Sequence, residues 1–257
     1  MDNQKIYDKA KEYLLSFPEI NNEILNNHLN YWKGKKPKDL KELFKKMVFH
    51  STNRQSMPNV IGDIDKLSSY IYNWNYEKVN DKYKSWEELF DTIKSSSYVP
   101  PGKMLKNNSH GLWVQFFKSI ISISLFVSRF KNIEEFNKFV ETFYFNEETR
   151  IALPLLIKEE IFGYQFALAC DFLKENGYPE FIKPDVHIID IFKGLKLTTG
   201  NNDFQIFRDV IKFSKSINKL PYEIDKLFWL IGSGKFYLNN IKIKTSKEDF
   251  INSIINI

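Results

Sequence analysis

Apolar residues recur at intervals of three and four positions along most of the chain, the spacing that places them on one face of an α-helix. Alternating apolar and polar runs bounded by turn residues are rare, and only residues 235–244 favour a small hairpin. The sequence therefore predicts an all-α protein. The expected helices span residues 4–16, 38–49, 58–73, 85–95, 111–129, 132–144, 147–158, 164–175, 186–195, 203–217, 222–232 and 246–256.

Several expected helices begin at residues that are typical N-caps. Asn132 precedes two glutamates, Ser85 is followed three positions later by Glu88, and Thr245 or Ser246 precedes a Lys-Glu pair. The most apolar stretch, residues 119–128, is about half the roughly 20 residues that a membrane span needs. We therefore expect a buried helix there and no membrane association.

Composition narrows the classes of protein that the chain can belong to. Its 257 residues are 43% hydrophobic, enough for a sizeable core, and its net charge of +5 suits a polyanionic partner without requiring one. A single cysteine, Cys170, excludes an internal disulfide, a thiolate zinc site and a four-cysteine iron–sulfur cluster. The N-terminus lacks the order of a secretory signal, so we expect a cytoplasmic protein. The histidines are scattered without ligand spacing, so we expect no metal and no cofactor: His28, His50, His110 and His187.

The stretch from Ile161 to Leu195 carries the residues of greatest chemical interest. Gly163 lies between two apolar helical patterns, where its turn would present backbone amides to a phosphate. Pro184 favours a helix start and places Asp185 in the first turn or at the cap, where the positive helix end favours an ionised carboxylate. An isolated aspartate before a helix is more often an ordinary N-cap, so its position alone does not indicate catalysis, and both interpretations stay open.

This stretch resembles the hairpin and active-site segment of the helix-hairpin-helix DNA glycosylases, including the 8-oxoguanine enzymes. Gly163 matches the second hairpin glycine, and Gln165 falls at the position of the family's lysine. Twenty residues beyond Gln165, Asp185 and His187 match the Asp and His of a Val-Asp-Val-His-like motif. The resemblance implies that Asp185 is the catalytic carboxylate. It also implies DNA contacts by Gly163, Tyr164, Lys183 and His187.

Residues 220–232 resemble the C-terminal helix of the archaeal 8-oxoguanine glycosylases. The matching positions are Asp225, Leu227, Trp229, Leu230 and Gly232. By resemblance Trp229 would stack on an extruded base, and Asp225 and Ala169 would help to line the base pocket. A tryptophan of the core is the alternative. The resemblance covers roughly residues 145–235 and implies two helical subdomains, 38–145 and 146–235, with the active-site cleft between them and the termini packed on them.

Two departures from the family pattern change the expected chemistry. Glu159-Glu160-Ile161-Phe162-Gly163 replaces a Leu-Pro-Gly-Val-Gly hairpin, so the first glycine is missing and two acids are added, which weakens the expectation of phosphate binding. Gln165 lacks the amine that forms a Schiff base with the sugar, so we expect a monofunctional enzyme. Lys183 is the alternative source of an amine.

The expected partner is double-stranded DNA that contains a damaged or modified base, bound by a monomer. In the polar run of residues 50–59, Asn53, Arg54 and Gln55 would fill the gap left by a flipped nucleotide, unless this run is an ordinary helix connection. His187 would contact a phosphate or belong to the core. Three alternatives stay open: a glycosylase that removes hypermodified bases from phage DNA in anti-phage defence, a non-catalytic helix-hairpin-helix DNA-binding protein, and a helical interaction protein without a nucleic-acid role.

Overall fold

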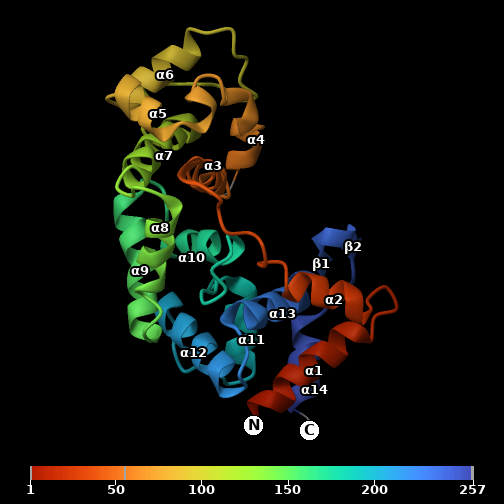
Figure 1. The fold of residues 1–257 in the computed structure, drawn as a ribbon. Helices are drawn as coiled ribbons and strands as arrows, with labels where there is room; N and C mark the ends of the chain where they lie inside the picture. Colours follow the sequence, from red (N-terminus) through yellow and green to blue (C-terminus); the bar gives the residue numbers. More distant parts are fainter. Residues whose placement is uncertain (1, 55, 256–257) are drawn as a thin grey trace. The chain divides into compact units, whose positions relative to one another are not determined.

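A computed structural model describes residues 2–54 and 56–255 and separates into two compact units. Unit 1 contains the chain up to Lys36, residues 144–151, and the chain from Leu173 onward; unit 2 contains residues 37–143 and 152–172. The described residues form fourteen α-helices, three short 3-10 turns and one pair of two-residue strands (Figure 1). This confirms the all-α prediction. No helix of the described ranges has the length and hydropathy that crossing a bilayer requires.

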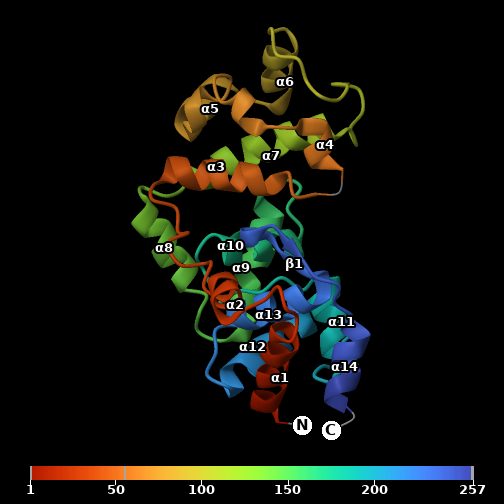
Figure 2. The same cartoon turned by 90° about the vertical axis from the view of Figure 1, so that its right-hand side faces the viewer.

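Helix α13 lies at the centre of unit 1, where it contacts α1, α2, α11, α12 and α14. Its residues are buried on nearly every face, in keeping with its central place. Helices α1 and α14 lie side by side, so the two ends of the chain meet in this unit (Figures 1 and 2). The elements that lie wholly in unit 1 are α1 (Asn3–Leu15), α2 (Asn22–Leu29), α11 (Val186–Gly194), α12 (Asp203–Ser216), α13 (Pro221–Ser233), β1 (Lys235–Phe236), η3 (Tyr237–Asn239), β2 (Ile241–Lys242) and α14 (Lys247–Ile255).

Helix α7 lies at the centre of unit 2, where it contacts α3, α4, α5 and α6. It includes most of the apolar stretch 119–128, and ten of its residues are buried, as the sequence predicts. The elements wholly in unit 2 are α3 (Leu40–Ser51), α4 (Met57–Ile61), η1 (Ile64–Leu67), η2 (Tyr72–Trp74), α5 (Tyr76–Lys82), α6 (Trp86–Lys94), α7 (Leu112–Val127) and α8 (Ile133–Glu141).

Two helices contribute residues to both units. Helix α9 (Glu147–Glu160) begins in unit 1 and continues into unit 2 from Ala152, whereas α10 (Phe166–Glu175) begins in unit 2 and ends in unit 1. Pro154 lies inside α9 and cannot donate the hydrogen bond that would normally reach the carbonyl four residues earlier. The five residues 161–165 join α9 to α10 and form the hairpin turn of the sequence analysis.

Local sequence signals position several helix starts and the hairpin correctly. The Asn132 side chain accepts from the Glu135 N–H at 2.9 Å, and the Ser246 hydroxyl accepts from the Asp249 N–H at 3.0 Å. Ser85 is the N-cap of α6, but its side chain makes no capping hydrogen bond. Strands β1 and β2 pair antiparallel, Lys235 opposite Lys242, which confirms the predicted hairpin.

The predicted helix over residues 58–73 is wrong. Helix α4 ends after Ile61 because Gly62 adopts a φ of +71°, and the Asp63 side chain then caps the 3-10 turn η1. The sequence analysis also misses α2 and α5. These helices are only eight and seven residues long, too short to show repeated apolar periodicity, and both begin at an asparagine cap, Asn21 and Asn75.

Gly234 ends α13 with a φ of +65°, and a Cβ there would collide with the backbone carbonyl oxygen of Ile243. Gly34 has a similar φ of +70°, but a Cβ there would meet no atom within 4 Å. We expect Gly34→Ala to lower the free energy of unfolding by about 1 kcal/mol, the cost of the left-handed backbone. Gly234→Ala should lower the free energy of unfolding by clearly more than Gly34→Ala does. Urea unfolding of both variants tests this, and equal midpoints would show that the close approach to Ile243 is unimportant.

Candidate active site

Asp185 is the N-cap of α11, in the position that the sequence predicts. Its Oδ1 atom accepts from the backbone N–H groups of His187 at 2.9 Å and Ile188 at 3.2 Å. The side chain is half-buried, and among the described residues its Oδ2 atom has no hydrogen-bond or ion-pair partner. The carboxylate is thus fixed through one oxygen at the positive end of a helix and retains a second oxygen that can interact with another group.

Asp225 holds the segment that leads to Asp185. Its side chain is 1% exposed, and its Oδ2 atom accepts from the backbone N–H of Lys183 at 2.6 Å, two residues before Asp185. Its Oδ1 atom accepts from the Lys174 ammonium at 2.5 Å. Burial raises the pKa of Asp225 and the negative charge of Asp185 adds to this effect, whereas Lys174 opposes it. Asp225 therefore anchors the backbone of the site from inside unit 1.

A second buried ion pair adjoins the first. The Lys226 ammonium, on a residue that is 3% exposed, lies 2.9 Å from a Glu175 carboxylate oxygen and 2.9 Å from the Tyr237 hydroxyl. Glu175 also lies 3.4 Å from the Lys174 ammonium, so two lysines and two acids form one network. Burial lowers the pKa of Lys226, as does the charge of Lys174, and Glu175 opposes both. Its partners nevertheless compensate much of the cost of burying this charge.

Trp229 stands at the edge of this network and is half-buried. Its ring lies 6.0 Å from that of Tyr237 at an interplanar angle of 71°, and the Lys226 ammonium lies 5.5 Å from the indole ring. The same ammonium lies 5.2 Å from the Tyr222 ring, whose hydroxyl is buried and makes no hydrogen bond within the described chain. Trp229 thus belongs to an aromatic cluster around a cation and keeps part of its surface exposed.

His187 packs against α13 at a glycine. A Cβ on Gly232 would lie 2.5 Å from the His187 Cβ atom, so α11 and α13 approach each other closely only because residue 232 has no side chain. The Nδ1 atom of His187 is buried and has no hydrogen-bond partner among the described residues. Burial lowers the pKa of His187, and the charge of Asp185 opposes the shift. The imidazole is therefore neutral at neutral pH.

The hairpin turn lies in unit 2 and is fixed by serines of α7. The N–H of Phe162 donates to the Ser122 hydroxyl at 2.9 Å, and the Ser119 hydroxyl donates to the Phe162 carbonyl at 2.8 Å. The N–H of Tyr164 donates to the Ile161 carbonyl at 3.1 Å. Two amides of the turn therefore already have acceptors inside the protein.

Arg54 and Gly163, which the sequence analysis treats separately, meet in unit 2. A Cβ on Gly163, whose φ is +84°, would lie 2.6 Å from the Arg54 Nη1 atom. The guanidinium also donates to the Gln115 side chain, and burial lowers the pKa of Arg54. Arg54 thus packs against the hairpin turn. A side chain at position 163 would be strained by the φ of +84° and would require the guanidinium to shift.

The remaining candidate residues lie in different environments. Asn53 and Gln165 are exposed, and Lys183 is half-buried. Ala169 is fully buried in α10, and Tyr164 is buried with its hydroxyl donating to the Met47 carbonyl at 2.8 Å. Gln55 lies outside the described residues. Within residues 2–54 and 56–255, no cluster of three His, Cys, Asp or Glu side chains could hold a metal ion.

The sequence analysis missed Lys174, Glu175 and Lys226. A signal for them exists, because each is a charged residue embedded in an otherwise apolar helical pattern, as in Phe172-Leu173-Lys174-Glu175. Charged residues on a buried face are almost always paired. The pairing itself, between α10 and α13, depends on how unit 1 packs.

No family model matches this chain, and no match was found among curated proteins or solved structures.

Removing the charge of Asp225 should destabilise the protein strongly. Asp225→Asn removes the carboxylate that lies 2.5 Å from the buried Lys174 ammonium, and breaking a buried ion pair typically costs about 3–5 kcal/mol of unfolding free energy. Glu12→Gln is the matched control, because it breaks the exposed Lys9–Glu12 pair and should cost less than about 1 kcal/mol. Urea unfolding measures both. A double variant with Lys174→Met should recover part of the loss, and additive effects of the two substitutions would contradict a direct Lys174–Asp225 interaction.

Proposed function

We propose that this protein is a DNA glycosylase that hydrolyses the N-glycosidic bond of a flipped damaged or modified base, with Asp185 as its catalytic carboxylate. The supporting observation is the fixed carboxylate of Asp185, which uses Oδ1 to cap α11 and leaves Oδ2 without a partner among the described residues. An aspartate that served only as an N-cap would not need its preceding segment to be held by a second buried carboxylate, that of Asp225.

Cleavage of an N-glycosidic bond develops positive charge on the deoxyribose. A carboxylate held at a fixed position stabilises that charge, because it requires no reorganisation as the bond breaks. Asp185 Oδ2 would face the sugar and would also orient or deprotonate the attacking water. Asp225 then acts as a positioning residue, because its hydrogen bond to the Lys183 N–H limits movement of the segment that carries Asp185.

Base recognition is assigned to Trp229. Its indole is half-buried beside Tyr237 and the Lys226 ammonium, so its orientation is fixed by packing before any base arrives. Extruding a base from the duplex costs a few kcal/mol, which stacking on such a ring would offset. Asp225 has both oxygens engaged by Lys174 and the Lys183 N–H, so its proposed role is to support the residues around the base and not to bind the base directly.

The enzyme is proposed to be monofunctional. Gln165 is exposed and carries no amine, and the ammonium groups of Lys174 and Lys226 are buried in ion pairs. Lys183 is half-buried and is the one alternative amine close to Asp185 in the sequence. We propose that the substrate is double-stranded DNA. The base that is removed is either a damaged base, as in repair, or a hypermodified base of phage DNA, and both kinds of duplex are tested.

Asp185→Asn should reduce base release by about 100-fold or more, because an amide cannot stabilise a cationic sugar. Stability should change little, since asparagine is as good an N-cap as aspartate. Release is measured on duplexes carrying oxidised guanine, on other lesion-bearing duplexes and on phage DNA with hypermodified pyrimidines. Asp39→Asn is the matched control, because Asp39 caps α3 in the same way, through the Glu42 N–H at 2.7 Å. Equal activity of wild type and Asp185→Asn would end the proposal, as would an equal loss in Asp39→Asn.

Wild-type product strands should stay intact until alkali is added, because Gln165 supplies no amine that could form a Schiff base. Borohydride added during the reaction should therefore trap no covalent protein–DNA adduct. Prompt nicking without alkali would contradict the monofunctional assignment. If nicking occurred in wild type and was lost in Lys183→Gln, the lyase amine would be that of Lys183.

A further inference from the structure

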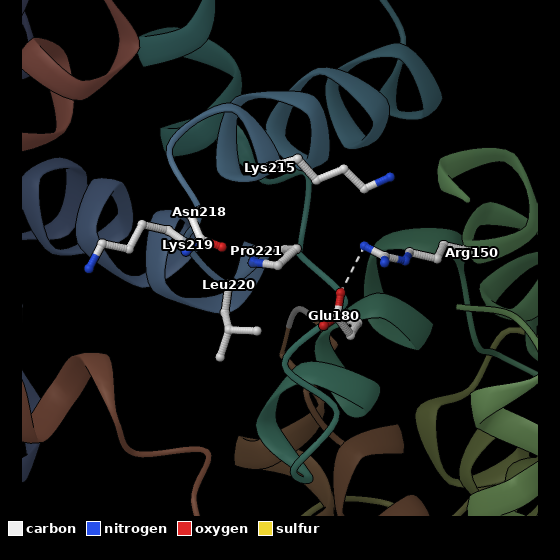
Figure 3. A pocket seen from close by; sticks show the side chains of 7 residues that line it. All are labelled: Arg150, Glu180, Lys215, Asn218, Lys219, Leu220 and Pro221. Atoms are coloured by element: carbon white, nitrogen blue, oxygen red, sulfur yellow. Dashed lines mark ion pairs between the residues drawn. The ribbon is translucent and has the colours of Figure 1, made fainter. Parts of the chain in front are cut away.

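Unit 1 contains a pocket of about 500 Å³ that is separate from the residues assigned to catalysis (Figure 3). This volume lies within the range of small-molecule binding sites. The walls come from α9, from the segment after α10, from the end of α12 and from the connection that leads into α13. The lining residues are Arg150, Glu180, Lys215, Asn218, Lys219, Leu220 and Pro221.

Arg150 is a buried cation with unused donors. The residue is 7% exposed, and its Nη2 atom donates to the Tyr144 carbonyl at 3.3 Å. Its Nη1 atom lies 2.9 Å from a Glu180 carboxylate oxygen, but neither Nε nor Nη1 makes a hydrogen bond of good geometry within the described chain. Buried guanidinium donors without acceptors are costly, and an anion that accepted from them would recover that cost.

Lys215 supplies a second cation on the same side of the pocket. Its side chain extends from α12 toward Arg150, whereas Lys219 points away (Figure 3). The Lys219 ammonium lies 3.4 Å from Glu223, and that of Lys215 lies 2.8 Å from Glu147. Pro221 is the first residue of α13; no side chain caps this helix, and the Tyr222 N–H donates to the Pro179 carbonyl at 2.9 Å.

The carboxylates around the pocket determine which anion can enter. Glu180 pairs with Arg150 and Glu147 pairs with Lys215, so a ligand must compete with two singly charged groups. A ligand with a single carboxylate carries the same charge as Glu180 or Glu147 and would not displace either of them from its cation. A phosphate monoester carries about −1.5 to −2 charges at neutral pH and three acceptor oxygens, and it can bridge both cations at once.

We propose that this pocket binds a small phosphate monoester, with its phosphate between Arg150 and Lys215. The ester portion would lie against Leu220 and Pro221, and the side-chain amide of Asn218, which makes no hydrogen bond among the described residues, would bind its hydroxyl groups. The proposal is independent of DNA glycosylase activity, since none of these residues belongs to the Asp185 site.

Calorimetric titration of the full chain with ribose 5-phosphate tests the proposal, with inorganic phosphate, ribose and malonate as comparison ligands. Ribose 5-phosphate should bind most tightly, inorganic phosphate more weakly, and ribose not at all. Lys215→Gln should weaken binding of ribose 5-phosphate about tenfold or more, the effect of losing one charge-assisted hydrogen bond. Lys212→Gln is the matched control: it removes the same charge from an exposed position on α12 outside the pocket lining and should leave the affinity within about twofold.

Arg150→Gln should abolish binding, and its circular dichroism spectrum shows whether the variant folds. If it does not fold, Asn218→Ala replaces it and should weaken binding of ribose 5-phosphate more than binding of inorganic phosphate. Absence of binding to ribose 5-phosphate up to about 10 mM would overturn the proposal. Equal losses in Lys215→Gln and Lys212→Gln would also overturn it, as would malonate binding as tightly as the phosphate ester.

Discussion

The buried carboxylate of Asp225 joins three segments of unit 1 that are far apart in the sequence. It accepts from the Lys174 ammonium at the end of α10 and from the Lys183 N–H before α11, and it is itself part of α13. A buried carboxylate is costly unless its charge and its hydrogen-bonding capacity are both satisfied, so losing either contact should destabilise this arrangement. The position of Asp185, two residues beyond Lys183, depends on this arrangement.

The same network holds the aromatic rings around Lys226 in place. Lys226 follows Asp225 directly on α13, and its ammonium lies between Glu175, the Tyr237 hydroxyl and the rings of Tyr222 and Trp229. The Lys226 ammonium and the surrounding rings therefore hold one another in place. A segment held by such a support has little freedom to rearrange, and the proposed function would use this rigidity to hold Asp185 in a fixed position.

Packing determines whether the backbone amides of the hairpin turn are available to bind a phosphate. A glycine turn between two helices presents backbone amides when the turn faces solvent. Here the Phe162 N–H donates to Ser122, the Tyr164 N–H donates to Ile161, and the Arg54 guanidinium fills the space beside Gly163. The glycine allows the close approach of an arginine, and this contact is visible only once the two segments are placed together.

The sequence by itself determined the helical class, the small hairpin near residue 240, several caps and the place of Asp185 at the start of α11, because these features depend on neighbours within a few residues. It failed at residues 58–73, where the left-handed backbone of Gly62 ends a helix that the apolar pattern would continue. Tertiary structure alone decided which buried charges pair, that Asp225 holds the Lys183 backbone, and that Arg150 and Lys215 share a pocket. Those contacts join residues that are 42 to 65 positions apart, and no local preference encodes the packing that brings them together.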